Sequence, residues 1–271
     1  MAADACSVSG RTAIVTGASR GIGRAVAERF ASEGANVALC SRSEDRIGAV
    51  VDQINENEGG RAIGVACNVR DRPQIEAFVD AAVEEFGGID TLVNNVGGLG
   101  GSPQEPLAKM DIEDWHAVLE LNLMGHVNCI LAALDHLRTA GNGSIVNVAS
   151  ETQTTPSPEL SHYGAAKAAV VQLTKTLAYE FAADDIRVNC VSPGLIQTDG
   201  GGKLLGIARE EIPPRETVDR RIGYPVEVAD VVRFLVSPAA TFITGQTVPV
   251  KGVPISRGRL ILDEQINLGI E

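Results

Sequence analysis

Short apolar runs and longer amphipathic stretches alternate along the chain. The short runs, which predict strands, stand at residues 12–16, 36–40, 62–67, 91–94, 144–148, 187–191 and 247–250. Runs such as 13–16 (AIVT) and 145–148 (IVNV) are nearly continuous in apolar residues rather than alternating. That pattern is typical of strands buried on both faces of a parallel sheet.

Helical spacing of apolar residues fills the intervals between the predicted strands. It predicts helices over residues 22–33 and 44–57, one starting near Pro73, and two long ones over 111–139 and 161–182. Asp111 is expected to cap its helix, because Asp accepts hydrogen bonds from the free N–H groups of a first turn. Strand and helix alternate from end to end, which predicts an α/β fold with a doubly wound parallel sheet of about seven strands and helices on both faces.

One stretch departs from this alternation. Residues 195–224 contain three consecutive glycines and the pair Pro213–Pro214, and a loop of this length in a compact domain is usually a lid or a disordered segment. We expect a mobile substrate loop over 195–224 and a C-terminal tail over 253–271, with no linker that divides the chain. The sequence therefore predicts one domain over residues 1–271.

Composition excludes several classes of function. The 35 Asp and Glu exceed the 23 Lys and Arg, and the net charge of −12 repels phosphate backbones, so we expect no nucleic-acid partner. The first residues lack a basic, then apolar, leader, and no apolar run is long enough to span a bilayer, so we expect a cytoplasmic protein without membrane contact. Five scattered cysteines without C-x-x-C spacing predict neither disulfides nor a zinc site.

The four histidines give no metal-binding pattern. Three of them, His116, His126 and His136, recur every ten residues, a spacing that turns them around a helix instead of placing them on one face. No metal site is therefore predicted. His162 is expected to be solvated at the start of its helix.

A glycine-rich turn directly follows the first predicted strand and opens the first helix. It has the spacing G-x-x-x-G-x-G, with glycines at 17, 21 and 23. Glycine lets the backbone approach a pyrophosphate, and a helix N-terminus supplies N–H donors and a positive dipole end. The turn therefore predicts a Rossmann-type, dinucleotide-binding domain, with these contact residues: Gly17, Ser19, Arg20, Gly21, Ile22 and Gly23.

The end of the second strand indicates which dinucleotide binds. An acid there would bind the 2′-hydroxyl of NAD, whereas a basic residue favours the 2′-phosphate of NADP. The sequence has Ser41 and Arg42 at this point, and Arg20 in the glycine turn adds a second guanidinium. We predict that NADP(H) is preferred over NAD(H).

A set of polar residues indicates acid–base chemistry. Tyr163 and Lys167 stand four residues apart on a predicted helix and share a face. Tyrosine has an ordinary pKa of about 10, and a neighbouring ammonium is expected to lower it. Ser150 follows the fifth strand, at the sheet edge where α/β folds bind ligands. Asn122 lies within an apolar helical stretch and needs a partner.

Taken in order, these motifs resemble the short-chain dehydrogenase/reductase family from about Gly10 to Gly252. The patterns are TGASRGIG at 16–23, NNVG at 94–97, Asn122, Ser150, YGAAK at 163–167 and PGLIQT at 193–198. The resemblance implies a carbonyl reduction in which hydride comes from a nicotinamide, and it further implies a homotetramer or homodimer.

The resemblance also implies a role for each matching residue. Tyr163 would be the general acid, Ser150 would polarise the carbonyl, and Lys167 would lower the pKa of Tyr163 and bind the nicotinamide ribose. Asn122 would hold a water linked to Lys167. The remaining cofactor contacts would be Asn68, Val69, Asn95, Gly97, Pro193, Gly194, Ile196 and Thr198.

Three hypotheses for the function follow. The first is an NADP(H)-dependent 3-oxoacyl-type ketoreductase, which the glycine turn and the arginine after the second strand favour. The second is a sugar, polyol or steroid dehydrogenase of the same fold. The third is a non-catalytic binding or regulatory protein, against which the intact set of Asn122, Ser150, Tyr163 and Lys167 argues.

Overall fold

The computed structural model describes residues 5–57, 59–198 and 222–252. Within them, seven parallel strands form one sheet in the order β3-β2-β1-β4-β5-β6-β7. The strands are β1 (Thr12–Thr16), β2 (Asn36–Ser41), β3 (Ala62–Ala66), β4 (Thr91–Asn94), β5 (Ser144–Val148), β6 (Arg187–Pro193) and β7 (Thr247–Val250). The α/β class, the parallel sheet and the predicted number of strands are confirmed.

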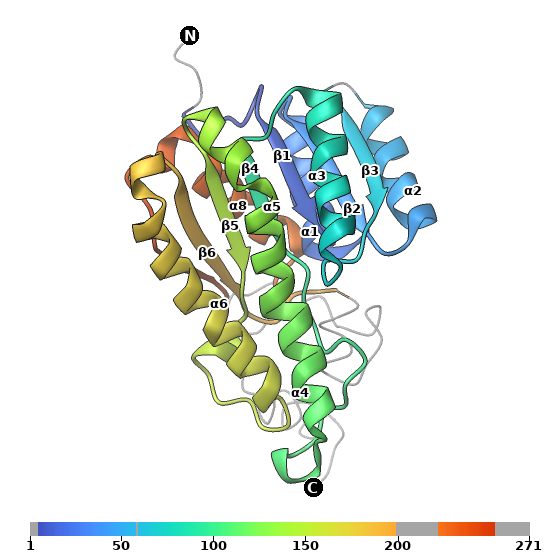
Figure 1. Cartoon of the computed structure of the whole chain (residues 1–271), viewed down its shortest axis with the longest axis vertical. Coiled ribbons are helices and arrows are strands. Elements are labelled where there is room, and N and C mark those ends of the chain that lie inside the picture. Colours follow the sequence, from blue (N-terminus) through green and yellow to red (C-terminus); the bar gives the residue numbers. More distant parts are fainter. Residues whose placement is uncertain (1–4, 58, 199–221, 253–271) are drawn as a thin grey trace, which may run out of the picture.

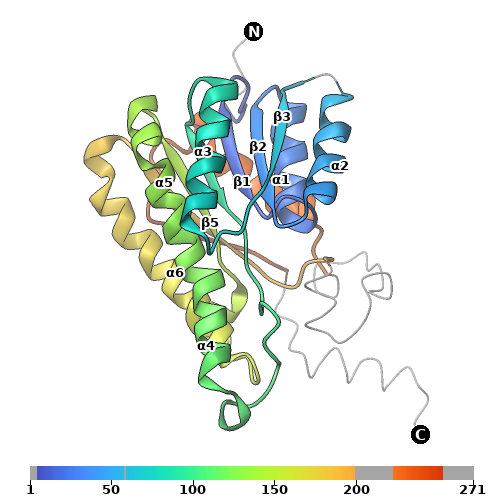
Figure 2. The same cartoon turned by 45° about the vertical axis from the view of Figure 1, so that its right-hand side comes forward.

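Helices cover both faces of the sheet, as Figures 1 and 2 show. One face packs against α1 (Gly21–Ser32), α2 (Glu44–Asn55) and α8 (Pro225–Val236). The other packs against α3 (Arg72–Phe86), α5 (Gly125–Ala140) and α6 (Ser161–Glu180). The predicted helices recur within about two residues of their expected bounds.

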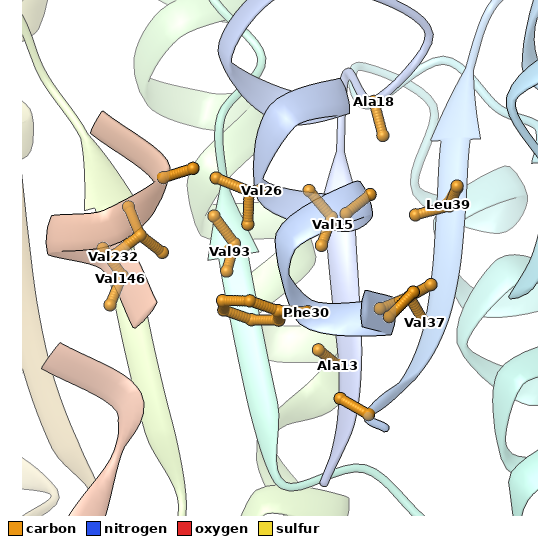
Figure 3. Packing of buried hydrophobic residues seen from close by; sticks show 14 of the residues in the cluster. Ala13, Val15, Ala18, Val26, Phe30, Val37, Leu39, Val93, Val146 and Val232 are labelled. Carbon is orange, nitrogen blue, oxygen red and sulfur yellow. The ribbon is translucent and has the colours of Figure 1, made fainter. Parts of the chain in front are cut away.

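Side-chain alternation along each strand divides the core into two layers. On β1, Ala13 and Val15 face α1 and α8, whereas Ile14 faces the opposite helices. Phe30 and Val26 of α1 lie against Val93, and Val232 of α8 lies beside Val146 (Figure 3). Because both faces are covered, the strands carry apolar residues at consecutive positions.

The long predicted helix over 111–139 is interrupted. Helix α4 (Ile112–Leu119) passes through a π-helical turn, Glu120–Met124, before α5 begins. Asp111 stands at the N-cap position, but its side chain accepts no capping hydrogen bond, so that prediction was wrong. In Figure 2, α4 and the start of α6 extend beyond the sheet edge at which the strands end.

The same stretch, Ile112–Ala140, is the one helical segment among the described residues that is long and apolar enough to cross a bilayer. This corrects the expectation that no such stretch exists. Its apolar side chains have another explanation in this fold. Cys129, Ile130, Ala133 and Leu137 are buried in the core between α5 and the sheet.

Two predicted regions fall largely outside the structure. Most of the expected substrate loop (residues 199–221) and the tail (residues 253–271) are outside the described residues. Short 3-10 turns, Leu107–Lys109, Glu151–Gln153, Ala182–Asp184 and Pro238–Ala240, connect the larger elements.

The packing of α1 predicts a large effect of truncating Phe30, which is 1% exposed. We expect Phe30→Ala to lower the free energy of unfolding by about 3–5 kcal/mol, because the ring leaves a cavity between α1 and the sheet. Phe242→Ala is the control, since that side chain is fully exposed, and we expect a change within about 0.5 kcal/mol. Urea unfolding measures both, and equal losses would contradict the packing described.

Candidate active site

A cavity of about 950 Å³ opens at the carboxyl ends of the strands. Its walls come from the turn after β1, the segments that follow β2 to β6, and one face of α6. β1 and β4 are neighbours on the sheet although β2 and β3 separate them in sequence, so the chain reverses direction across the sheet at this point. Such a switch point is the usual ligand site of open α/β sheets.

The glycine turn is held by Asn95, which directly follows β4, the neighbour of β1 in the sheet. Asn95 donates from Nδ2 to the Thr16 carbonyl at 2.9 Å and to the Gly17 carbonyl at 3.2 Å. Gly17 has a φ of +66°, a conformation that other residues rarely adopt. A Cβ at Gly23 would overlap the Asn95 side chain. The turn therefore keeps its shape only with glycine at these points.

The cavity wall is positively charged. Arg20, Arg42, Arg46 and Lys167 line it, and no Asp or Glu is among the described residues that do. Glu44 and Asp45 lie instead in the first turn of α2. A concave surface with charges of one sign focuses its field, so this cavity attracts phosphate groups despite the acidity of the whole chain.

Ser150, Tyr163 and Lys167 share one wall of the cavity. Tyr163 and Lys167 lie on successive turns of α6, with Lys167 Nζ 5.8 Å from the centre of the Tyr163 ring. Nζ also donates a hydrogen bond to the Val148 carbonyl at 2.9 Å, which ties α6 to the end of β5. Ser150 follows that strand, and its Oγ accepts a hydrogen bond from Thr152 N at 3.3 Å.

Burial controls the ionisation of this group. It lowers the pKa of Lys167 to about 8. It also raises the pKa of Tyr163, with a hydrogen bond from Ser150 acting in the opposite direction. The low-dielectric surroundings disfavour the charged forms of both side chains. That Lys167 lowers the pKa of Tyr163 stays a prediction.

Asn122 lies behind the cavity instead of lining it. Its Oδ1 accepts from Gly98 N at 2.9 Å, and its Nδ2 donates to the carbonyls of Gly98 at 2.7 Å and Val118 at 2.8 Å. The buried amide thus fixes the glycine-rich segment after β4 to the π-helical turn. A water bound by Asn122, as the resemblance implies, stays a prediction.

A model of the short chain dehydrogenase family matches residues 11–205. The chain belongs to the short-chain dehydrogenase/reductase family. It is an NAD(P)-dependent oxidoreductase, as the family and its relatives are.

Known relatives cover nearly the whole chain. A 3-oxoacyl-(acyl-carrier-protein) reductase of Thermotoga maritima is 38% identical over 245 residues, which are 90% of this chain and 98% of that protein. A 7α-hydroxysteroid dehydrogenase complexed with NADH and 7-oxo glycochenodeoxycholic acid has a TM-score of 0.83 at 30% identity, covering 93% of this chain and 98% of that one. L-sorbose reductase of Gluconobacter frateurii, complexed with NADPH and L-sorbose, has a TM-score of 0.81 at 34% identity, covering 92% and 98%.

The structure of this family member brings together nearly all of the residues predicted for the site. Those that line the cavity are Gly17, Ser19, Arg20, Gly21, Ile22, Ser41, Arg42, Asn68, Val69, Asn95, Gly97, Ser150, Tyr163, Lys167, Pro193, Gly194, Ile196 and Thr198. Gly23 and Asn122 are the two that do not, and both support the wall from behind.

Several residues that line the cavity were not predicted from the sequence. Those that face the same cavity include Arg46, Cys67, Ser102, Gln104 and Leu121. Arg46 could have been found, because it lies in the first turn of α2, shortly after the strand end that carries Arg42. His162 was wrongly predicted to be solvated: it is 0% exposed, and its ring centre lies 6.2 Å from that of Trp115.

No group of three or more His, Cys, Asp or Glu side chains in the described part of the chain could hold a metal ion. His126, one of the spaced histidines, instead supports the cavity wall. It is 1% exposed, and its Nε2 lies 3.0 Å from the Val96 carbonyl, which fixes the tautomer with the proton on Nε2. Burial and the positive charge of Lys167 lower its pKa from 6.5 to about 3.

This pKa predicts a pH-dependent stability. Unfolded His126 takes up a proton near pH 6.5, whereas the folded side chain stays neutral down to about pH 3, so its contribution is complete above pH 6.5 and is lost as pH falls. From pH 7 to pH 5 we expect a loss of about 2 kcal/mol, which His126→Gln removes because glutamine does not titrate. Urea unfolding at several pH values measures it.

The exposed His116 lies almost three turns earlier on the same helical stretch and provides the matched control. His116→Gln is expected to keep the pH dependence of the wild type. Identical pH profiles for wild type and His126→Gln would show that His126 does not carry the effect.

Proposed function

We propose that this protein is an NADP(H)-preferring ketoreductase that interconverts a ketone and a secondary alcohol, with 3-oxoacyl thioesters as its substrate class. The observation that carries the proposal is the meeting of Ser150, Tyr163 and Lys167 in one cationic cavity. A reductase of 3-oxoacyl groups among the relatives supports the substrate class.

The residues of the cavity fit a dinucleotide phosphate. The glycine turn offers backbone N–H groups at the start of α1, and Arg20, Arg42 and Arg46 offer guanidinium groups for a 2′-phosphate. A Cβ at Gly97 would lie 2.7 Å from Lys167 Nζ, so this wall is open to a ligand only because residue 97 is glycine. When bound, the nicotinamide supplies the hydride.

Ser150, Tyr163 and Lys167 carry the proton side of the reaction. The Ser150 hydroxyl donates a hydrogen bond to the substrate carbonyl oxygen, and Tyr163 gives its phenolic proton to the same oxygen. Burial raises the pKa of Tyr163, so the phenol keeps its proton until the substrate oxygen gains negative charge and becomes the stronger base. Lys167, with a pKa of about 8, is largely charged at neutral pH and stabilises the phenolate that remains.

We further propose a cytoplasmic homotetramer. Met124 and Leu131 are 39% and 48% exposed on the stretch that includes α5, and Tyr179 is 89% exposed on α6. Apolar side chains exposed on two long helices favour self-association, as is common in this family.

The catalytic proposal predicts the effect of removing one oxygen atom. In Tyr163→Phe we expect kcat to fall about 100-fold or more, since a positioned general acid contributes at least that much, while NADPH binding is retained. Tyr179→Phe is the matched control on the same helix, and its activity should equal that of the wild type.

The assay follows the loss of reduced nicotinamide absorbance with 3-oxoacyl thioesters, L-sorbose and a 7-oxo steroid as separate substrates. Turnover of thioesters supports the proposed class, whereas turnover of the sugar or steroid alone would replace it. Tight NADPH binding without turnover of any carbonyl would favour a non-catalytic role.

The cofactor proposal predicts the effect of removing a guanidinium. We expect Arg42→Gln to raise KM for NADPH about tenfold, the effect of losing one charged hydrogen bond, and to leave KM for NADH nearly unchanged. Arg61→Gln removes a surface arginine that pairs with Glu85 outside the cavity, and it should alter neither value. A wild-type enzyme that prefers NADH would refute the proposed preference.

A further inference from the structure

Three of the five cysteines form one buried cluster beside the cavity. Cys40 lies on β2, Cys67 directly follows β3, and Cys129 lies on α5, which covers this face of the sheet. They are 0%, 3% and 3% exposed. Pairing of the two strands brings the first two together, because Cys67 N donates to the Ser41 carbonyl at 2.8 Å.

The three thiols differ in what they face. Cys67 lines the cavity between the residues that follow β2 and those that follow β3, including Arg42 and Asn68. Cys40 and Cys129 do not line it. The small exposed surface of Cys67 therefore belongs to the cavity. A reagent reaches its sulfur through the space beside Arg42, where the 2′-phosphate end of the cofactor is proposed to bind.

The neighbouring thiol makes Cys67 the better nucleophile. Cys40 donates a hydrogen bond to the Cys67 sulfur, which lowers the pKa of Cys67 and raises that of Cys40. Burial raises the pKa of Cys129. Because the thiolate is the reactive form, Cys67 is set apart from the other two by its ionisation as well as by its position.

We propose that Cys67 is a site of reversible modification by low-molecular-weight disulfides, and that bound nucleotide blocks it. The Cys67 thiolate attacks one sulfur of the disulfide, a new sulfur–sulfur bond forms at Cys67, and the old one breaks. The leaving thiolate takes up the proton that Cys67 released, so the disulfide is reduced as Cys67 is oxidised. A thiol reverses the step.

The group added at Cys67 occupies the cavity wall beside Arg42 and Asn68. Modification of Cys67 therefore prevents nucleotide binding, and bound nucleotide prevents modification of Cys67. This inference rests on the proposed position of the cofactor in the cavity, whereas the reactivity of the thiol does not.

The test uses bis(2-hydroxyethyl) disulfide on the full chain, with peptide mass spectrometry to measure modification at each cysteine. We expect Cys67 to be modified and NADPH binding, followed by its fluorescence, to be lost in parallel and restored by dithiothreitol. With NADPH at about ten times its Kd, modification of Cys67 should slow about tenfold, since only the free protein reacts. Cys6, partly exposed and outside the cavity, serves as the internal control, and its rate should not change.

Matched variants separate the thiols. Cys129→Ala should remain sensitive to the disulfide, and Cys67→Ala should lose no further activity on treatment. The proposal fails if Cys67 stays unmodified while Cys6 reacts, or if bound NADPH leaves the rate at Cys67 unchanged. Modification of Cys67 in a protein that binds no NADPH would refute the proposed function, and with it the protection, but not the reactivity.

Discussion

The buried ammonium group of Lys167 constrains the surrounding site more than any other charge. It is 1% exposed, and its hydrogen bond to the Val148 carbonyl offsets part of the cost of removing a charge from water. The space beside it can hold no side chain, so residue 97 is glycine. The same charge helps to keep His126 neutral, and a neutral His126 can hold the Val96 carbonyl at the cavity wall.

The cavity wall and the protein as a whole carry charges of opposite sign. The chain carries a net charge of −12, yet the cavity wall carries Arg20, Arg42, Arg46 and Lys167 without an acid among its described residues. Anionic ligands are repelled by most of the surface and attracted at one opening. This charge distribution directs anionic ligands to the cavity before any specific hydrogen bond between ligand and protein forms.

Much of the fold could be predicted because continuous apolar runs in the sequence mark the strands that are buried on both faces of the sheet. The bounds of β1, β4 and β5 agree with the apolar runs, since strands covered on both faces consist mostly of apolar residues. Helix α8 was not predicted, although Val228, Ala229 and Val232 have helical spacing. The burial of His162 depends on Trp115, far away in sequence.

The site was predictable to the extent that it follows strand ends. The glycine turn, Ser150 and the pair on α6 occupy positions that the topology brings to one edge. Gln104 and its neighbours after β4 line the cavity through a loop whose path depends on Asn122, and no local pattern records that contact. The directions of the pKa shifts depend on burial, which is a property of the folded chain.

The π-helical turn at Glu120–Met124 has a consequence for how this sequence can change over time. A π turn holds one residue more than an α turn, so deleting a residue there would restore a regular helix and rotate α5 by about 100° relative to α4. Each side chain of α5 would then take the place of the one before it, so exposed Leu131 would enter the buried place of Ile130 and buried Ala133 would move to the half-buried place of Ala132. The two halves of this helix are locked in phase by a single inserted residue, so substitutions are far more acceptable here than changes in length.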